Sequence, residues 1–191
     1  MIRTARYLLA AGLLLTAMPA AAQYQDPAPL QAAQRTAMQR LAFMDGVWRG
    51  PAWSLTPAGR RDMIQTERAG TFVGGTVRVF EGRGYDPDGQ VGFNALGVVS
   101  FDPASGRYSL STWALGRHAT VPLTITETGF VWETPAGPGA IIRYTATIRD
   151  GTWHEVGEII APGRPPLRVV ELNLRRVGDT DWPGAGAVPM R

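Results

Sequence analysis

From residue 46 onward, apolar and polar side chains alternate with a period of two in short runs separated by turn sequences. In residues 140–149, Ile142, Tyr144 and Ala146 would share one face, and Arg143 would lie on the other. A period of two is typical of a strand with one buried face. The pattern predicts strands at 46–55, 61–69, 76–85, 91–101, 107–115, 120–127, 130–133, 140–149, 152–160 and 167–177.

The sequences between these runs are those of tight turns. Asp150-Gly151 is the pattern of a two-residue hairpin, and residues 86–89 and 102–106 are rich in Asp, Pro and Gly. No helical run separates the strands, so parallel folds with crossover helices are excluded. Many short antiparallel strands are typical of a sandwich or a barrel. We predict an all-β fold, an antiparallel up-and-down β-barrel of about ten strands spanning residues 46–177.

The pattern before the barrel is different. Residues 23–29 are polar and contain proline, and residues 30–44 carry apolar side chains near a period of 3.6. The 23–45 segment is therefore expected to form a short N-terminal helix that caps one end of the barrel. Residues 178–191, rich in Gly, Ala and Pro, are expected to form a flexible C-terminal tail.

The first 22 residues have the pattern of a signal peptide. Arg3 and Arg6 precede an apolar run at 7–18, and small residues lead to a cleavage site after Ala22. This predicts a periplasmic or secreted protein with no membrane span after cleavage. The chain has no cysteine, which excludes disulfides and thiolate metal sites.

The charge pattern excludes one class of partner. All 19 basic residues are arginines, and the 16 acidic residues are interspersed among them. A nucleic-acid-binding surface needs clustered basic side chains, so no nucleic-acid partner is expected.

Short motifs occur along the barrel in a fixed order. They are Gly46-Val47-Trp48-Arg49-Gly50, Gly74-Gly75, Glu81-Gly82-Arg83-Gly84-Tyr85-Asp86, Ser100-Phe101-Asp102, Phe130-Val131-Trp132-Glu133, Asp150-Gly151-Thr152-Trp153-His154-Glu155 and Glu171-Leu172 to Arg176. This order resembles the DUF1579 family of the lipocalin-like (calycin) group. The resemblance implies a closed antiparallel barrel and the hypothesis of small-ligand binding. The family has no settled activity, and the disulfide typical of calycins is absent here.

Several side chains are candidates for a ligand site inside such a barrel. Trp113 and Trp132 could stack on a flat apolar molecule, with Tyr144, Arg143 and Glu155 orienting it. The alternative for each tryptophan is ordinary core packing.

Two glutamates are the only candidates for catalysis. An inward Glu67 or Glu155 would need a partner, and could serve as a general base. The alternative for both is a structural salt bridge or a solvated rim charge.

Trp48 and Arg176 lie near the two ends of the barrel sequence and are expected to form a structural clasp by cation–π contact. His154-Glu155 resembles a zinc motif, but that motif requires a helix, so no metal is expected. We expect no cofactor, with haem held by His154 as the alternative.

The leading functional hypothesis is an exported lipocalin-like barrel that binds a small, largely apolar ligand. One alternative is a barrel enzyme that uses an interior Glu as general base. Another is a structural envelope protein with a filled barrel. Neither the ligand nor the oligomeric state follows from the sequence.

Overall fold

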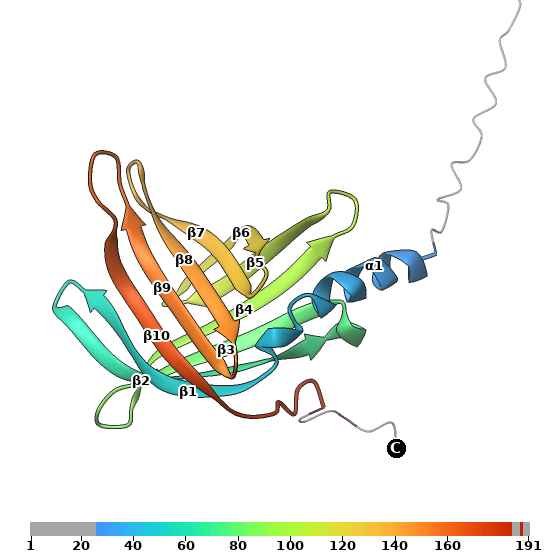
Figure 1. Cartoon of the computed structure of the whole chain (residues 1–191), viewed down its shortest axis with the longest axis horizontal. Helices are drawn as coiled ribbons and strands as arrows, with labels where there is room; N and C mark the ends of the chain where they lie inside the picture. The colour runs from blue at the N-terminus through green and yellow to red at the C-terminus, as the bar shows by residue number, and fades with distance from the viewer. Residues whose placement is uncertain (1–25, 185–187, 189–191) are drawn as a thin grey trace, which may run out of the picture.

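Ten antiparallel strands close into a barrel in the computed structural model, which describes residues 26–184 and residue 188 (Figure 1). The strands are β1 Gly46–Thr56, β2 Gly59–Phe72, β3 Val77–Tyr85, β4 Val91–Asp102, β5 Arg107–Ala114, β6 Arg117–Ile125, β7 Gly129–Gly137, β8 Ala140–Arg149, β9 Thr152–Ile160 and β10 Leu167–Gly178. Each strand pairs with its neighbours in sequence, and β1 pairs with β10 to close the ring. The predicted barrel of about ten strands is confirmed. The predicted signal peptide lies outside the described residues.

Three strands differ from the expected bounds by two or more residues, and one of them is β6, which covers Arg117–Ile125 instead of the expected 120–127. Strand β2 is longer at both ends than the expected 61–69, and β7 runs on to Gly137 although it contains Pro135. Proline cannot donate to a sheet, and the pairing of β7 with β8 is irregular between Pro135 and Gly137. The strand therefore continues past the proline by means of a local irregularity.

The N-terminal helix is shorter than expected and breaks into two pieces. Helix α1 covers Ala28–Gln39, and a 3-10 turn, η1, covers Ala42–Met44. Both Leu41 and Met44 are fully buried against the barrel core. No helix among residues 26–184 has the length and apolar character needed to cross a bilayer.

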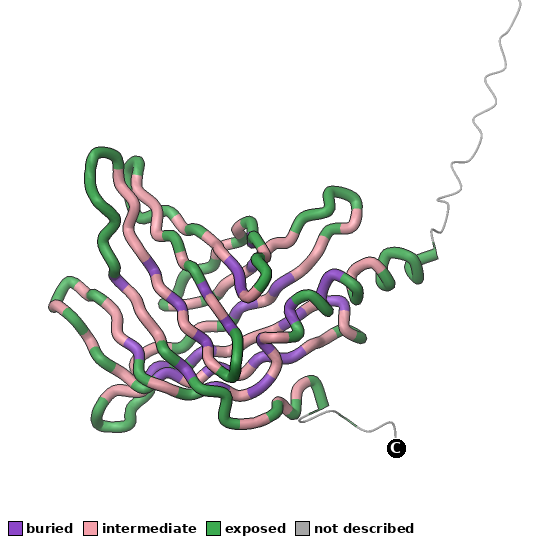
Figure 2. Tube along the Cα trace, viewed as in Figure 1, coloured by how far each residue is buried: buried purple, intermediate pink, exposed green. Residues whose placement is uncertain are grey.

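Most fully buried residues lie in the half of the barrel next to α1 (Figure 2). The Trp48 indole N–H donates to the Met44 carbonyl at 2.9 Å, and its ring packs edge-on against Trp153 at 5.8 Å. Gly46 has a φ of +135°, and a Cβ there would lie 2.7 Å from the Arg176 side chain. Only glycine fits this position. We call the half of the barrel next to α1, which contains Trp48 and Trp153, the closed end.

A buried arginine ties the helical segment to the closed end. The Arg78 side chain projects inward from β3 with 1% exposure. Its guanidinium donates to the Leu41 carbonyl and forms an ion pair of 3.0 Å with Asp45. Burial raises the pKa of Asp45, and the charge of Arg78 opposes that rise. Arg78 therefore joins three segments: β3, η1 and the start of β1.

Replacing Arg78 by Met should lower the free energy of unfolding by about 2–4 kcal/mol, because it leaves a partly buried carboxylate and a carbonyl without their donor. The matched control is Arg83→Met, on the outer face of the same strand, which should cost less than about 1 kcal/mol. Urea denaturation measures both. Equal effects of the two substitutions would contradict the anchoring role.

Candidate functional site

Strand pairing fixes which side chains face the barrel interior. Adjacent residues in a strand point to opposite faces, and paired residues on neighbouring strands share a face. Glu67 on β2 pairs with Trp48 on one side and Gly82 on the other, so all three positions face inward. On β8 and β9, Tyr144 and Glu155 face inward by the same rule, because they pair with Gly157 and Ala146.

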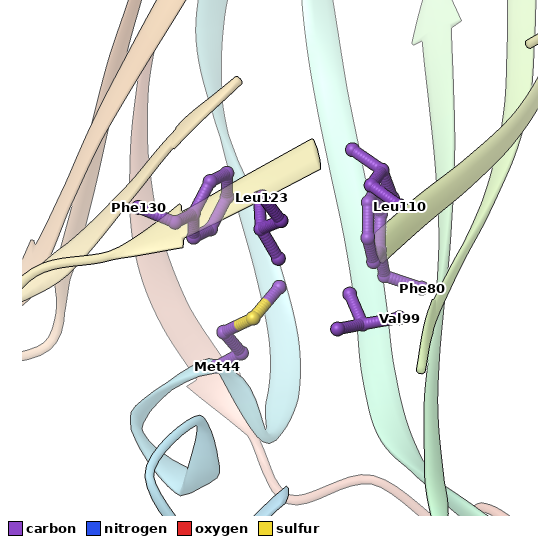
Figure 3. Close-up of a pocket in the computed structure, with 6 residues that line it drawn as sticks. All are labelled: Met44, Phe80, Val99, Leu110, Leu123 and Phe130. Carbon is purple, nitrogen blue, oxygen red and sulfur yellow. The ribbon is translucent and has the colours of Figure 1, made fainter. Parts of the chain in front are cut away.

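The closed end offers no room for a ligand. The gap between its apolar side chains is too narrow to hold a water molecule. Figure 3 shows the side chains that converge on it, which are Met44, Phe80, Val99, Leu110, Leu123 and Phe130. Because this half is filled by the core, any ligand space must lie toward the other end.

The opposite half, which we call the mouth, is less completely filled. Met63 and Phe93 occupy inward positions there, yet each keeps partial exposure. Two paired inward residues there are small, Ala95 on β4 and Ala114 on β5. Partly exposed inward side chains and a wall of small residues indicate an interior that solvent reaches from the mouth.

Two aromatic rings lie between the closed end and the mouth. Trp132 on β7 and Tyr144 on β8 stack in parallel, with ring centroids 4.0 Å apart and an interplanar angle of 8°. A Cβ at Gly157 would lie 2.9 Å from the tyrosine ring, so a glycine there lets the ring lie flat. Burial raises the pKa of Tyr144 to about 12, and Glu155 adds to the rise. The phenol therefore stays neutral and can donate a hydrogen bond.

Glu155 lies on β9 within reach of the core tryptophans. Its side chain is 9% exposed, and its Oε2 accepts a hydrogen bond from the Trp153 indole N–H at 3.1 Å. Burial raises the pKa of Glu155, while hydrogen bonding from Trp153 and Trp132 opposes the rise. The Glu155 carboxyl faces inward, and one of its two oxygens has a hydrogen-bond partner.

Glu67 is the second buried carboxyl, at 8% exposure. Its Oε1 accepts a hydrogen bond of 2.7 Å from the Gln65 side-chain amide, while its Oε2 is buried without a partner. The carboxyl lies over Gly82, where a Cβ would collide with it. Burial raises the pKa of Glu67 to about 8, Gln65 opposes the rise, and the charges of Glu155 and Glu81 add to it.

Of the five ligand-site candidates, Trp132, Tyr144 and Glu155 meet on the inner wall, whereas Trp113 and Arg143 do not. Trp113 is 44% exposed on the outer face of β5 and stacks on His118 at 4.7 Å. It lines an open groove of about 500 Å³ that Ala95 and Ala114 also line. Arg143 pairs with Glu133 at 2.7 Å on the outer face. The expectation that both face a ligand inside the barrel is corrected, because alternation puts Thr112 and Tyr144 inward instead.

The other candidates also have defined places. His154 faces outward and lies 3.1 Å from Glu171, so it is not available to a group held inside the barrel. Trp48 and Arg176 are paired across β1 and β10, but the Arg176 guanidinium bonds the Asp45 carbonyl and Asp179 rather than the indole. The two residues close the same end through separate contacts, and the cation–π clasp is corrected.

Sequence reasoning missed Gln65 and Arg78. The signal for Gln65 was its spacing of two from Glu67, which puts amide and carboxyl on one face of a strand. Arg78 gave no comparable signal, because an arginine in a strand is usually exposed. No group of three or more metal-ligating side chains comes together within the described residues.

The fold and inner wall together define a closed antiparallel barrel with one filled half and two buried carboxyls. No protein-family model matches the chain, and no curated protein matches it. Among solved structures, Rv2717c from M. tuberculosis is similar, with a TM-score of 0.55 and 15% sequence identity. The similarity covers 73% of this chain and 96% of that one. At this identity the likeness supports the barrel fold alone.

Replacing Glu67 by Gln should flatten the pH dependence of stability. Between its ordinary pKa of 4.5 and the raised value of about 8, Glu67 keeps a proton in the folded state that the unfolded chain has lost. The free energy of unfolding of the wild type therefore falls as pH rises through this range.

The side chain introduced by Glu67→Gln has the shape of protonated Glu67 but cannot ionise, so the variant does not lose stability as the pH rises. Its free energy of unfolding at about pH 8.5 should therefore exceed that of the wild type by about 2–4 kcal/mol. Urea denaturation across the pH range measures this, with Glu133→Gln on the outer face as control. A wild type whose stability rises from about pH 5 to about pH 8 relative to the variant would contradict the buried neutral acid.

Proposed function

We propose that this protein is an exported, lipocalin-like barrel of the DUF1579 type that binds a small, largely apolar molecule in its mouth half. The proposal of export rests on the signal-peptide pattern of residues 1–22. The likeness to DUF1579 rests on the order of its motifs. Ligand binding is supported by the barrel interior.

The observation that carries the proposal is the Trp132–Tyr144 ring pair on the wall of an incompletely filled half-barrel. Tyr144 occupies one face of the Trp132 indole, so a flat apolar ligand would pack against the other face and gain about 25 cal/mol for each Å² of apolar surface that it buries.

A filled structural barrel is supported less well. It would have inward side chains as buried at the mouth as they are at the closed end. At the closed end Leu110 and Leu174 have no exposure and Phe80 is partly exposed, whereas Met63 and Phe93 nearer the mouth are both partly exposed. The site that we propose is therefore open to solvent and not an enclosed cavity.

The test uses N-phenyl-1-naphthylamine, an uncharged apolar fluorophore, titrated into the purified protein. We expect its fluorescence to rise on binding, and Trp132→Leu to weaken binding about tenfold through loss of the stacking face. Trp113→Leu is the matched control on the outer face and should bind like the wild type.

Ala95→Trp provides a second test, because it fills the mouth without removing a core contact and should abolish binding. Thermal denaturation of each variant confirms that it is folded. The proposal would be overturned if the wild type did not bind the fluorophore. It would also be overturned if Trp113→Leu lost binding while Trp132→Leu kept it. Native mass spectrometry of protein from its own cells then identifies any natural ligand.

The buried carboxyls favour a barrel enzyme as a second candidate. A carboxyl whose pKa is raised by burial suits general acid–base catalysis, and both Glu67 and Glu155 have this property. This function predicts that a molecule copurified with the protein is chemically converted by the wild type and left intact by Glu155→Gln. Mass spectrometry of the small-molecule fraction over time measures the conversion. An unchanged molecule in both would exclude this candidate.

A further inference from the structure

We propose that Glu67 and Glu155 form an acidic floor that receives a protonated amine carried by the ligand. This inference rests on the proposed function, since the amine would lie below an apolar body stacked on Trp132. It assigns the chemical class of the ligand: an organic cation with a flat apolar part.

The first support is the unpartnered oxygen. Glu67 is more than nine-tenths buried, yet its Oε2 makes no hydrogen bond. Leaving a buried polar atom unsatisfied costs about 1–3 kcal/mol. Its neighbour Oε1 is already held by Gln65, so the free oxygen has a fixed position. Oε2 is itself shielded from solvent, so a ligand donor must displace the side chains that cover it in order to reach it and recover that cost.

The second support is the balance of charge inside the barrel. Arg61 and Arg78 are the inward arginines that are not exposed, and each has a carboxylate partner, Asp86 and Asp45 respectively. Within the described residues, no ion pair involves Glu67 or Glu155. Arg117 has an inward register, because it pairs with Ala114, but it is exposed at the mouth; the buried part of the interior therefore carries two acids and no unpaired base, which is complementary to a cation.

The surroundings of Glu67 supply no other cation. The residues that pair with Glu67, Trp48 on β1 and Gly82 on β3, are uncharged, and the charged residues that flank them, Arg49, Glu81 and Arg83, lie on the outer face by alternation. Across the interior lie Glu155 and the neutral phenol of Tyr144. The charge of Glu155 therefore disfavours ionisation of Glu67 until a cation arrives.

Amine binding should consequently release a proton. In the empty site at neutral pH, Glu67 is protonated, because burial raises its pKa to about 8. An ammonium group that donates to Oε2 favours the ionised carboxylate, so the carboxyl proton passes to the buffer and an ammonium–carboxylate pair remains. Affinity for the amine should rise by up to about tenfold per pH unit below the pKa of Glu67 and level off above it.

The experiment compares 1-naphthalenemethylamine with 1-naphthalenemethanol, which share the ring system and differ in the charged group. Isothermal titration calorimetry at about pH 6 and about pH 8, in buffers of different ionisation enthalpy, gives affinity and proton release. We expect the wild type to prefer the amine by at least about tenfold at the higher pH, with a smaller preference at the lower pH.

Glu67→Gln should remove this preference, the proton release and the pH dependence. Glu133→Gln, on the outer face, should behave as the wild type. Equal binding of the two compounds, or a preference that survives Glu67→Gln, overturns this inference and leaves the proposed function standing. If neither compound binds to the wild type, the proposed function itself fails.

Discussion

The closure of β1 on β10 is the constraint on which the rest of the structure depends. Once the ring is closed, each strand has two partners, and the inward face of one strand fixes the inward face of the next around the barrel. The closed end secures that ring with apolar and polar contacts together. The Trp48 indole spans from the Met44 carbonyl to Trp153, and Arg78 ties η1 to β3 and Asp45. With one end secured in this way, the other end can remain open without loss of the fold.

The polar layer above the core has a cost that the core must offset. Burying two carboxyls disfavours their charged forms, and one of the four carboxyl oxygens has no partner at all. The closed end supplies the compensation, because Trp48, Trp153 and Leu174 are almost completely buried beside this layer. Stability and a potential binding surface are thus divided between the two halves of one barrel.

Much of this fold could be predicted from the sequence, because period-two alternation and turn residues are local signals. The bounds of 140–149 and 152–160 agree with the observed strands, since Asp150-Gly151 fixes the hairpin between them. The inward face was harder to predict on β5, where Trp113 and Leu110 are both apolar and only the register with β4 shows which is inside. Contacts between distant segments, such as Arg78 with Leu41, have no local signal. The partner of Glu67 lay two residues away and could have been found by the same alternation that predicted the strand.

The buried carboxyls inside the barrel distinguish a purely structural barrel from a ligand-binding barrel and from an enzyme. A barrel that only needs to be stable gains nothing from an unpaired carboxyl, because a leucine or methionine at position 67 would bury apolar surface without a desolvation penalty. Binding and catalysis both use such a group, and they differ in what happens after the ligand arrives. A binding site needs the carboxyl to gain a partner, whereas a general base must pass its proton on and recover. The fixed Gln65 contact holds Glu67 in one position with Oε2 free, which suits a permanent partner better than a group that must shuttle protons.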